Sequence, residues 1–271
     1  MNLLERKMVD ALKDLSENYA VNGVKAEFEA EGTRLEEALR LKEVVMKAGI
    51  GLTIKIGGCE ALRDMYECRT IGVQRIVAPM IESAFALKKF ISASRLAFPD
   101  DEREEIKFAA NIETITGCHN IESMLELPEI SHLSGIVMGR VDLTGSLGLS
   151  REDINTKQIF DITKELFIIS KKKGLENAIG GGVSAYSLPF FRDLPAGSID
   201  RYETRKVIFK CPEALEQNAD KGILKAVGFE LLWLRNKRDY YKIISMEDNQ
   251  RLEMLEKRYK LLIEQAGGRV E

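Results

Sequence analysis

Short segments that are apolar throughout, or that alternate apolar and polar residues, recur along the chain between longer segments with helical periodicity. Eight segments have this pattern, at residues 24–31, 51–57, 75–83, 108–114, 135–143, 178–183, 199–209 and 228–235. Strands that alternate with amphipathic helices are typical of β/α units. Eight such units favour a closed barrel over an open sheet. The pattern therefore predicts an α/β fold, a single (β/α)8 TIM-type barrel.

Two helices are predicted outside the repeating units. Residues 1–20 place apolar side chains at helical spacing among charges, which indicates an N-terminal amphipathic helix rather than a signal peptide. Ser245 begins a C-terminal helix that we expect over residues 245–267. No Pro, Ser or Gly-rich linker interrupts residues 1–271, so one domain is predicted. The eighth strand, residues 228–235, also fits the start of a C-terminal helical extension.

Composition excludes several classes of function. The 271 residues are 45% hydrophobic, enough for a sizeable core, and the formal net charge is -3. Lys and Arg are scattered among Asp and Glu, so no basic stripe predicts a nucleic-acid partner. No apolar run has the length of a membrane span. The four cysteines form no C-x-x-C pair, which predicts neither a zinc knuckle nor a disulfide framework, and a cytoplasmic location is expected.

Several predicted strands carry polar residues on the face that points into the barrel. That face is expected to hold Lys25, Glu27, Glu29, Glu31, Lys55, Asn111 and Glu113, with Arg140 and Asp142 sharing a face of the fifth strand. The seventh strand alternates Arg201, Glu203 and Arg205 with Tyr202, Thr204 and Lys206, so either face brings charge inside. Charges inside a barrel need ionic partners or a metal, because an isolated buried charge costs several kcal/mol. The alternative is an open sheet whose edge strands carry solvated charges.

Three segments resemble the HpcH/HpaI aldolase and citrate lyase family. They are Asn111-Ile112-Glu113-Thr114, the segment Gly135 to Gly148 with its R-V-D-L-T-G-S-L-G run, and Ala78-Pro79-Met80-Ile81-Glu82-Ser83. The resemblance implies that Glu113 and Asp142 are the protein ligands of a Mg²⁺ or Mn²⁺ ion. It also implies a carbon–carbon lyase or aldolase that assembles as a homo-oligomer, a trimer or a hexamer.

A hard cation held by one Glu and one Asp keeps waters that a 2-oxo acid displaces, and it stabilises the enolate that forms when a carbon–carbon bond breaks or forms. Two structural alternatives remain at this point. Glu113 can instead form a salt bridge with Arg140, and Asp142 can be a cap or turn residue.

The chain departs from the family pattern at two positions. Glu29-Ala30-Glu31-Gly32 stands where family aldolases carry a His that forms part of the base, and Lys55 stands where they carry an Arg that contacts the keto oxygen. We predict that Glu29 or Glu31 is the base and that Lys55 supplies a single positive charge to the keto oxygen. Arg140 is expected to supply the bidentate guanidinium contact that Lys55 cannot make. Alternatively, Lys25, Glu27 and Glu29 only neutralise one another.

Further residues are expected to bind the substrate. Gly180-Gly181-Gly182 lets a carboxylate or phosphate approach the backbone, unless it serves only a tight bend, and the charged run from Arg201 is suggestive of anion binding, unless it is solvated or ion-paired. The predicted substrate-binding set is Lys25, Glu27, Glu82, Gly139, Gly181, Arg201 and Arg205.

The sequence thus predicts a metal-dependent lyase that acts through the enolate of a pyruvate-like 2-oxo acid or a related acyl group. Two other functions stay open. One is a Schiff-base aldolase that uses Lys25, Lys55 or Lys206, since a lysine among cations can have a lowered pKa. The other is a non-catalytic barrel that binds metal and oxo acid and has lost the base.

Overall fold

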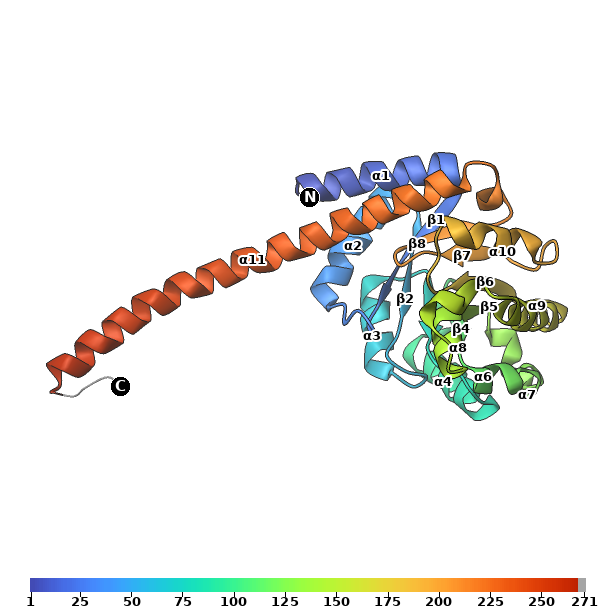
Figure 1. The fold of residues 1–271 in the computed structure, drawn as a ribbon. Coiled ribbons are helices and arrows are strands. Elements are labelled where there is room, and N and C mark those ends of the chain that lie inside the picture. Colours follow the sequence, from blue (N-terminus) through green and yellow to red (C-terminus); the bar gives the residue numbers. More distant parts are fainter. Residues whose placement is uncertain (268–271) are drawn as a thin grey trace.

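Eight strands form a closed barrel inside a ring of helices (Figure 1) in the computed structural model, which describes residues 1–267. The strands are β1 (Val21–Glu27), β2 (Gly51–Lys55), β3 (Arg75–Ala78), β4 (Lys107–Ile112), β5 (Gly135–Gly139), β6 (Glu176–Gly180), β7 (Arg201–Glu203) and β8 (Val207–Lys210). They follow one another around the barrel in chain order. The predicted barrel is confirmed.

Eleven α-helices connect or flank the strands within the described residues. They are α1 (Leu3–Tyr19), α2 (Leu35–Ala48), α3 (Leu62–Ile71), α4 (Ala84–Ala97), α5 (Asp100–Glu104), α6 (Ile115–His119), α7 (Ile121–Leu125), α8 (Arg140–Ser146), α9 (Lys157–Lys172), α10 (Leu188–Asp193) and α11 (Ala219–Gln265). None of the helices within residues 1–267 combines the length and the apolar content needed to cross a bilayer.

The barrel closes through an antiparallel strand. Strands β1 to β7 pair in parallel, whereas β8 runs antiparallel to both β7 and β1. The segment predicted as one seventh strand, residues 199–209, therefore contains two strands, joined by a reversal in which Val207 N donates to Thr204 Oγ1 at 3.1 Å. The predicted eighth strand at residues 228–235 is wrong. These residues are helical, because Phe229 and Trp233, four positions apart, pack on the barrel together.

Inward and outward residues alternate as predicted in the strands that form the site. Val24 and Ala26 of β1 are fully buried against the helices, which leaves Lys25 and Glu27 inside the barrel. In β7, Tyr202 faces outward. Its ring stacks between Phe191 and Phe209, with ring centroids 5.3 Å and 4.7 Å away, so that the flanking residues of β7 point inward. A small apolar layer of Val77, Ala109, Val137 and Ala178 fills the middle of the barrel.

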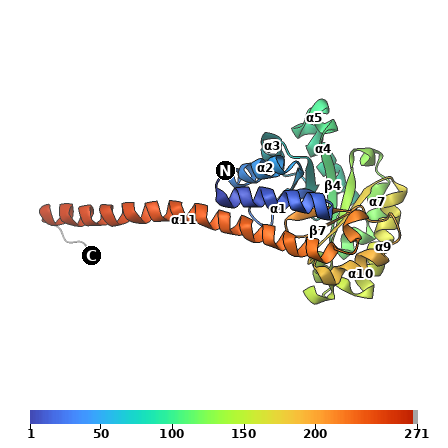
Figure 2. The same cartoon turned by 90° about the horizontal axis from the view of Figure 1, so that it is seen from above.

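The longest helix, α11, lies beside α1 over its first part and then extends far beyond the barrel (Figures 1 and 2). Its buried residues lie between Ala219 and Trp233. The C-terminal helix was predicted to begin at Ser245, which is too late. The predicted N-terminal helix agrees with α1.

Candidate metal and substrate site

A cavity of about 660 Å³ opens at the barrel mouth, where the carboxyl ends of the parallel strands meet. Active sites of β/α barrels lie at this end. Of the residues predicted for the site, those that line this cavity are Glu29, Lys55, Glu113, Asp142, Lys25, Glu27, Gly139, Gly181 and Arg205. The structure thus brings together residues of six different strands or of the loops that follow them.

Glu113 is held rigidly at the end of β4. Its Oε1 accepts a hydrogen bond from Met80 N at 3.0 Å and its Oε2 accepts one from Asn111 Nδ2 at 2.6 Å. Met80, whose N–H makes this bond, has a left-handed φ of 48°. A Cβ at Gly139 would lie 2.6 Å from Glu113 Oε2, so the glycine of β5 makes room for this side chain. The side chain is therefore pre-positioned.

The ammonium group of Lys55 lies between two carboxylates. Its Nζ is 2.8 Å from Glu29 Oε2 and 3.3 Å from Glu113 Oε1. Burial by itself lowers the pKa of Lys55, but the carboxylates of Glu113 and Glu29 raise it above its ordinary value. Lys55 is thus a fixed positive charge at neutral pH. It directs Glu29 into the cavity beside Glu113.

Asp142 lies in the first turn of α8, not in a strand, and its side chain is exposed to the cavity. Burial raises the pKa of Glu113 above its ordinary value, and the negative charge of Asp142 raises it further, against the lowering effect of Lys55. Among residues 1–267, Asp142 makes no side-chain hydrogen bond or ion pair. The two carboxylates therefore repel each other across one wall of the cavity, and Asp142 is not committed to another partner.

The predicted position of Arg140 in the mouth is wrong. Its side chain is fully buried behind the wall of the cavity, and the salt bridge to Glu113, which was the structural alternative to metal ligation, does not form. Instead the guanidinium donates to Gly180 O at 3.2 Å, to Gly181 O at 3.0 Å and to Asn155 Oδ1 at 2.7 Å. Burial lowers its pKa to about 9. Arg140 begins α8, and the change from strand to helix at this residue turns it away from the barrel axis.

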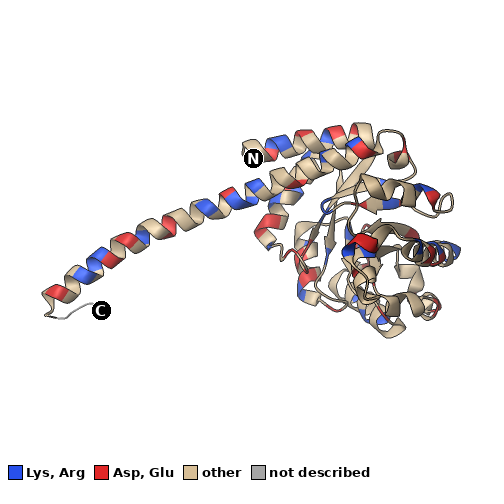
Figure 3. Ribbon diagram, viewed as in Figure 1, with Lys and Arg blue, Asp and Glu red and all other residues tan. Residues whose placement is uncertain are grey.

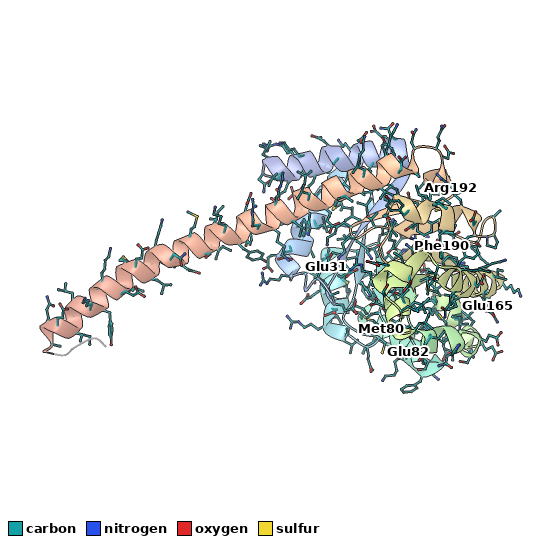
Figure 4. All side chains as sticks on the ribbon, in the orientation of Figure 1. Glu31, Met80, Glu82, Glu165, Phe190 and Arg192 are labelled. Atoms are coloured by element: carbon teal, nitrogen blue, oxygen red, sulfur yellow. The ribbon has the colours of Figure 1, made fainter. Side chains whose placement is uncertain are left out.

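Glu31 and Glu82, both labelled in Figure 4, were also predicted for the site but do not line the cavity. Glu31, on the loop after β1, pairs with Arg205 Nε at 3.1 Å and with the ammonium of Lys206, so it is a poor candidate for a free base. Glu82, on the loop after β3, accepts a hydrogen bond from Thr114 Oγ1 at 2.6 Å. Thr114 in turn caps α6. These two predicted site residues thus fasten the loops that carry Glu29 and Glu113.

The cations of the predicted seventh strand, residues 199–209, lie at opposite ends of the barrel. Arg205 lines the mouth, which confirms that the charged run contributes a cation there. Arg201 was predicted to bind substrate, but it lies at the start of β7, where its Nη1 is 2.9 Å from Glu176 Oε2. Arg75 approaches the same carboxylate at 2.9 Å. Alternation along a strand cannot distinguish the two ends of a barrel, which explains the error.

Three charged residues that line the cavity are not among the predicted catalytic, metal or substrate-binding residues, namely Glu203, Arg151 and Glu230. Glu203 is buried, and Lys25 Nζ lies 3.4 Å from its Oε2 and 3.2 Å from Glu27 Oε1. Glu203 lies two residues from Arg201 on the same face of the strand, and this pattern was the available signal that it points into the barrel. Arg151 and Glu230 come from a short 3-10 turn and from α11. Their local sequence contains no signal, since both positions look like ordinary solvent-facing ones.

The charges around the cavity do not balance. Six carboxylates line it, namely Glu27, Glu29, Glu113, Asp142, Glu203 and Glu230, against four cations, Lys25, Lys55, Arg151 and Arg205. A single divalent cation would neutralise this excess. Within residues 1–267 no group of three or more His, Cys, Asp and Glu is placed to hold a metal. Mg²⁺ requires only one or two protein carboxylates, because waters and substrate supply its other ligands.

The fold and this cavity define a β/α barrel with a carboxylate-rich site at the carboxyl ends of its strands. Residues 56–181 match the HpcH/HpaI aldolase/citrate lyase family. The match covers rather less than half of the chain and includes Glu113, Asp142 and Gly181, and it confirms the resemblance that the three motifs indicated. It leaves out β1 and β7, which supply the unusual charges.

Several solved structures share the fold of this chain at low sequence identity. Citrate synthase SbnG has a TM-score of 0.60 at 16% identity, over 86% of this chain and 90% of that one. An HpcH/HpaI aldolase/citrate lyase family protein from Burkholderia cenocepacia has a TM-score of 0.59 at 12% identity, over 88% and 90%. An HpcH/HpaI aldolase from Desulfitobacterium hafniense has a TM-score of 0.57 at 15% identity, over 72% and 82%. No curated protein matches the chain by sequence.

Proposed function

We propose that this protein is an aldolase or citrate lyase-like enzyme that makes or breaks a carbon–carbon bond next to a pyruvate-like 2-oxo acid or related acyl group, and that it depends on Mg²⁺ or Mn²⁺. The observation that carries the proposal is the placement of Glu113 and Asp142 on one wall of the cavity at the barrel mouth. The family match supports the class of reaction.

The donor set fits a hard divalent cation. Glu113 and Asp142 would hold it, since both offer carboxylate oxygens, and the excess of negative charge in the cavity favours it. When bound, the cation would act as a Lewis acid that stabilises negative charge on the keto oxygen of the substrate. Lys55, whose Nζ lies 3.3 Å from Glu113 Oε1, would add a second positive charge that stabilises the same developing negative charge.

The chain offers Glu29 as the group that moves a proton. It lines the cavity, whereas Glu31 is committed to Arg205 and Lys206. The Lys55 ammonium, 2.8 Å away, keeps Glu29 in place. At the rim, Arg205 and the backbone around Gly181 provide positive charge and a close approach for a substrate carboxylate. A Cβ at Gly181 would lie 2.6 Å from Val141 N, and its φ is 80°, so another residue there would be strained.

The positions of the lysines disfavour Schiff-base chemistry. Burial lowers the pKa of Lys25, but Glu203 and Glu27 raise it above its ordinary value, and Lys55 is raised likewise by its carboxylates. A protonated amine is not a nucleophile. The pKa of Lys206 is lowered by burial, yet its ammonium contacts Glu31 outside the cavity lining.

A second candidate function is a barrel that binds metal and oxo acid without catalysis. It is favoured by one observation: His119 and His132 both lie outside the cavity, which therefore has no imidazole base. The two candidates differ in one measurable property. A catalytic site exchanges the methyl protons of pyruvate with solvent, and a binding site does not.

The test is proton exchange by NMR in heavy water, with pyruvate and the full chain, in Mn²⁺ or Mg²⁺ and again in chelator. The proposal expects exchange that requires the cation and that is lost in Glu29→Gln. Glu36→Gln is the control, because it removes an exposed carboxylate of α2 that lies outside the cavity. Exchange that persists in chelator, together with a covalent adduct after borohydride, would overturn the proposal in favour of a lysine. Oxo-acid binding without exchange would favour the non-catalytic barrel.

A further inference from the structure

The second half of α11 extends away from the rest of the described chain, residues 1–267. The last contact of the helix with the barrel is near Tyr241, whose hydroxyl donates to Glu37 Oε1 at 2.5 Å. Among residues 1–267, no hydrogen bond or ion pair joins residues 242–265 to another element. We call this segment the arm. It spans roughly 36 Å at 1.5 Å per residue and projects away from the barrel (Figure 2).

The arm exposes an apolar stripe that continues the buried face of α11. Trp233 is 4% exposed, and steps of 7 and 11 residues from it lead to Tyr240 and Ile244, on the same side of the helix. Leu255 and Leu262 follow on this line. Ile244, Leu255 and Leu262 are 42%, 52% and 52% exposed. Large apolar side chains at successive helical positions in water indicate a surface that a partner covers.

At the root of the arm lies a second unfilled apolar feature. A groove of about 670 Å³ runs between α1, α2 and α11, and Leu3, Leu39, Tyr240 and Ile243 are among the residues that line it. Leu3 and Ile243 are 60% and 69% exposed. An occupant that covers the stripe and reaches this groove would bury both surfaces at once.

We propose that the occupant is the arm of a second copy of this chain, paired antiparallel. If Ile244 of one copy faces Leu262 of the other, the same register places Asp248 opposite Arg258 and Arg251 opposite Leu255. The first pair carries opposite charges, and in the second the aliphatic part of Arg251 packs on a leucine. The tip of each arm then lies at the other copy's groove, next to Ile243.

The charges disfavour a parallel, in-register pairing of two arms. Two arms paired parallel and in register would place Asp248 against Asp248 and Arg258 against Arg258. Such like-charge contacts disfavour an interface, whereas the antiparallel register converts both into ion pairs. Both signs of charge alternate along the arm (Figure 3), as a self-complementary surface requires. The inference goes beyond the proposed function and does not depend on it, because no arm residue lines the mouth.

The first test is the mass of the full-length protein in solution by sedimentation equilibrium. We expect a concentration-dependent dimer, and Leu255→Glu with Leu262→Glu should weaken its association on the order of 100-fold or more. Asn249→Glu with Gln250→Glu, on the polar face of the same helix, adds the same charge and should leave the dimer intact. A wild-type protein that stays monomeric at about 100 μM, well above the Kd of a micromolar dimer, or a dimer that survives the leucine changes, would overturn the proposal.

Two further tests fix the direction of pairing. An I244C chain mixed with an L262C chain should form a disulfide-linked heterodimer on oxidation, above the background that the four native cysteines give in wild type. I244C alone should not. Asp248→Arg should weaken the dimer, and Arg258→Asp added to it should restore the affinity. A cross-linked I244C homodimer, or no rescue in the double variant, would contradict the antiparallel register. A monomer that floats with anionic lipid vesicles would assign the stripe to a membrane surface instead.

Discussion

The two carboxylates proposed as metal ligands differ in burial and in the contacts that they make within the protein. Mutation can therefore separate their contribution to metal binding from their contribution to stability. Asp142 is exposed and uncommitted, whereas Glu113 is 2% exposed and accepts from Met80 N, Asn111 and Lys55. Asp142→Asn and Glu113→Gln both keep the shape of the side chain and remove its charge. We expect both to weaken Mn²⁺ binding by at least about tenfold, or about 1.4 kcal/mol, because a site with two protein carboxylates depends on each.

Their effects on the metal-free protein should be opposite. Asp142 repels Glu113, so Asp142→Asn should leave the stability unchanged or slightly higher. Glu113→Gln removes the charge that faces Lys55 in the interior. Breaking a buried pair costs about 3–5 kcal/mol, and the low end applies because Lys55 keeps Glu29 at 2.8 Å. A loss of about 3 kcal/mol corresponds to a melting temperature lower by roughly 6–12 °C.

Calorimetric Mn²⁺ titration and thermal melts in chelator measure the two effects separately. The result that would refute the reasoning is an Asp142→Asn protein that binds Mn²⁺ normally but melts much earlier than wild type. Asp142 would then be a structural residue. Equal destabilisation by the two substitutions would contradict the difference in burial from which the magnitudes are worked out.

Two further predictions concern charges away from the cavity. Burial raises the pKa of Glu176, but Lys107, Arg75 and Arg201 outweigh this and lower it to about 2, so its contribution is complete above pH 4.5 and is lost as the pH falls toward 2. With its side chain 33% exposed, Glu176→Gln should cost about 2 kcal/mol in urea unfolding at pH 7, and a difference that does not shrink on acidification would contradict this account. Arg140→Met should cost about 3 kcal/mol by leaving buried carbonyls without donors, yet folded protein should bind Mn²⁺ with normal affinity. A stable Arg140→Met protein that no longer binds pyruvate or exchanges its protons would contradict this account, because it would indicate that Arg140 contacts the substrate.

The pattern along the chain was sufficient to predict which residues of β1, β2 and β4 point into the barrel. Side chains of a strand alternate with a period of two. The apolar residues next to Lys25, Lys55 and Glu113 in the sequence face the helices, so the charged residues had to face inward. The motif around Asp142 placed it on the same cavity wall, although it lies in a helix. These are local properties, and the three-dimensional structure does not change them.

Tertiary structure decided the closure of the barrel and the direction of several charges. The pattern over residues 199–209 is the same for one strand as for a hairpin, and only the free edge of β1, which β8 covers, selects the hairpin. Residues 228–235 became helical because Phe229 and Trp233 bury their side chains on the barrel. The direction of Arg140 depends on where β5 ends and α8 begins, and carbonyl groups distant in the sequence, at Gly180 and Gly181, determine what its guanidinium contacts. Such partners are set by the packing of the whole chain, so no local pattern contains them.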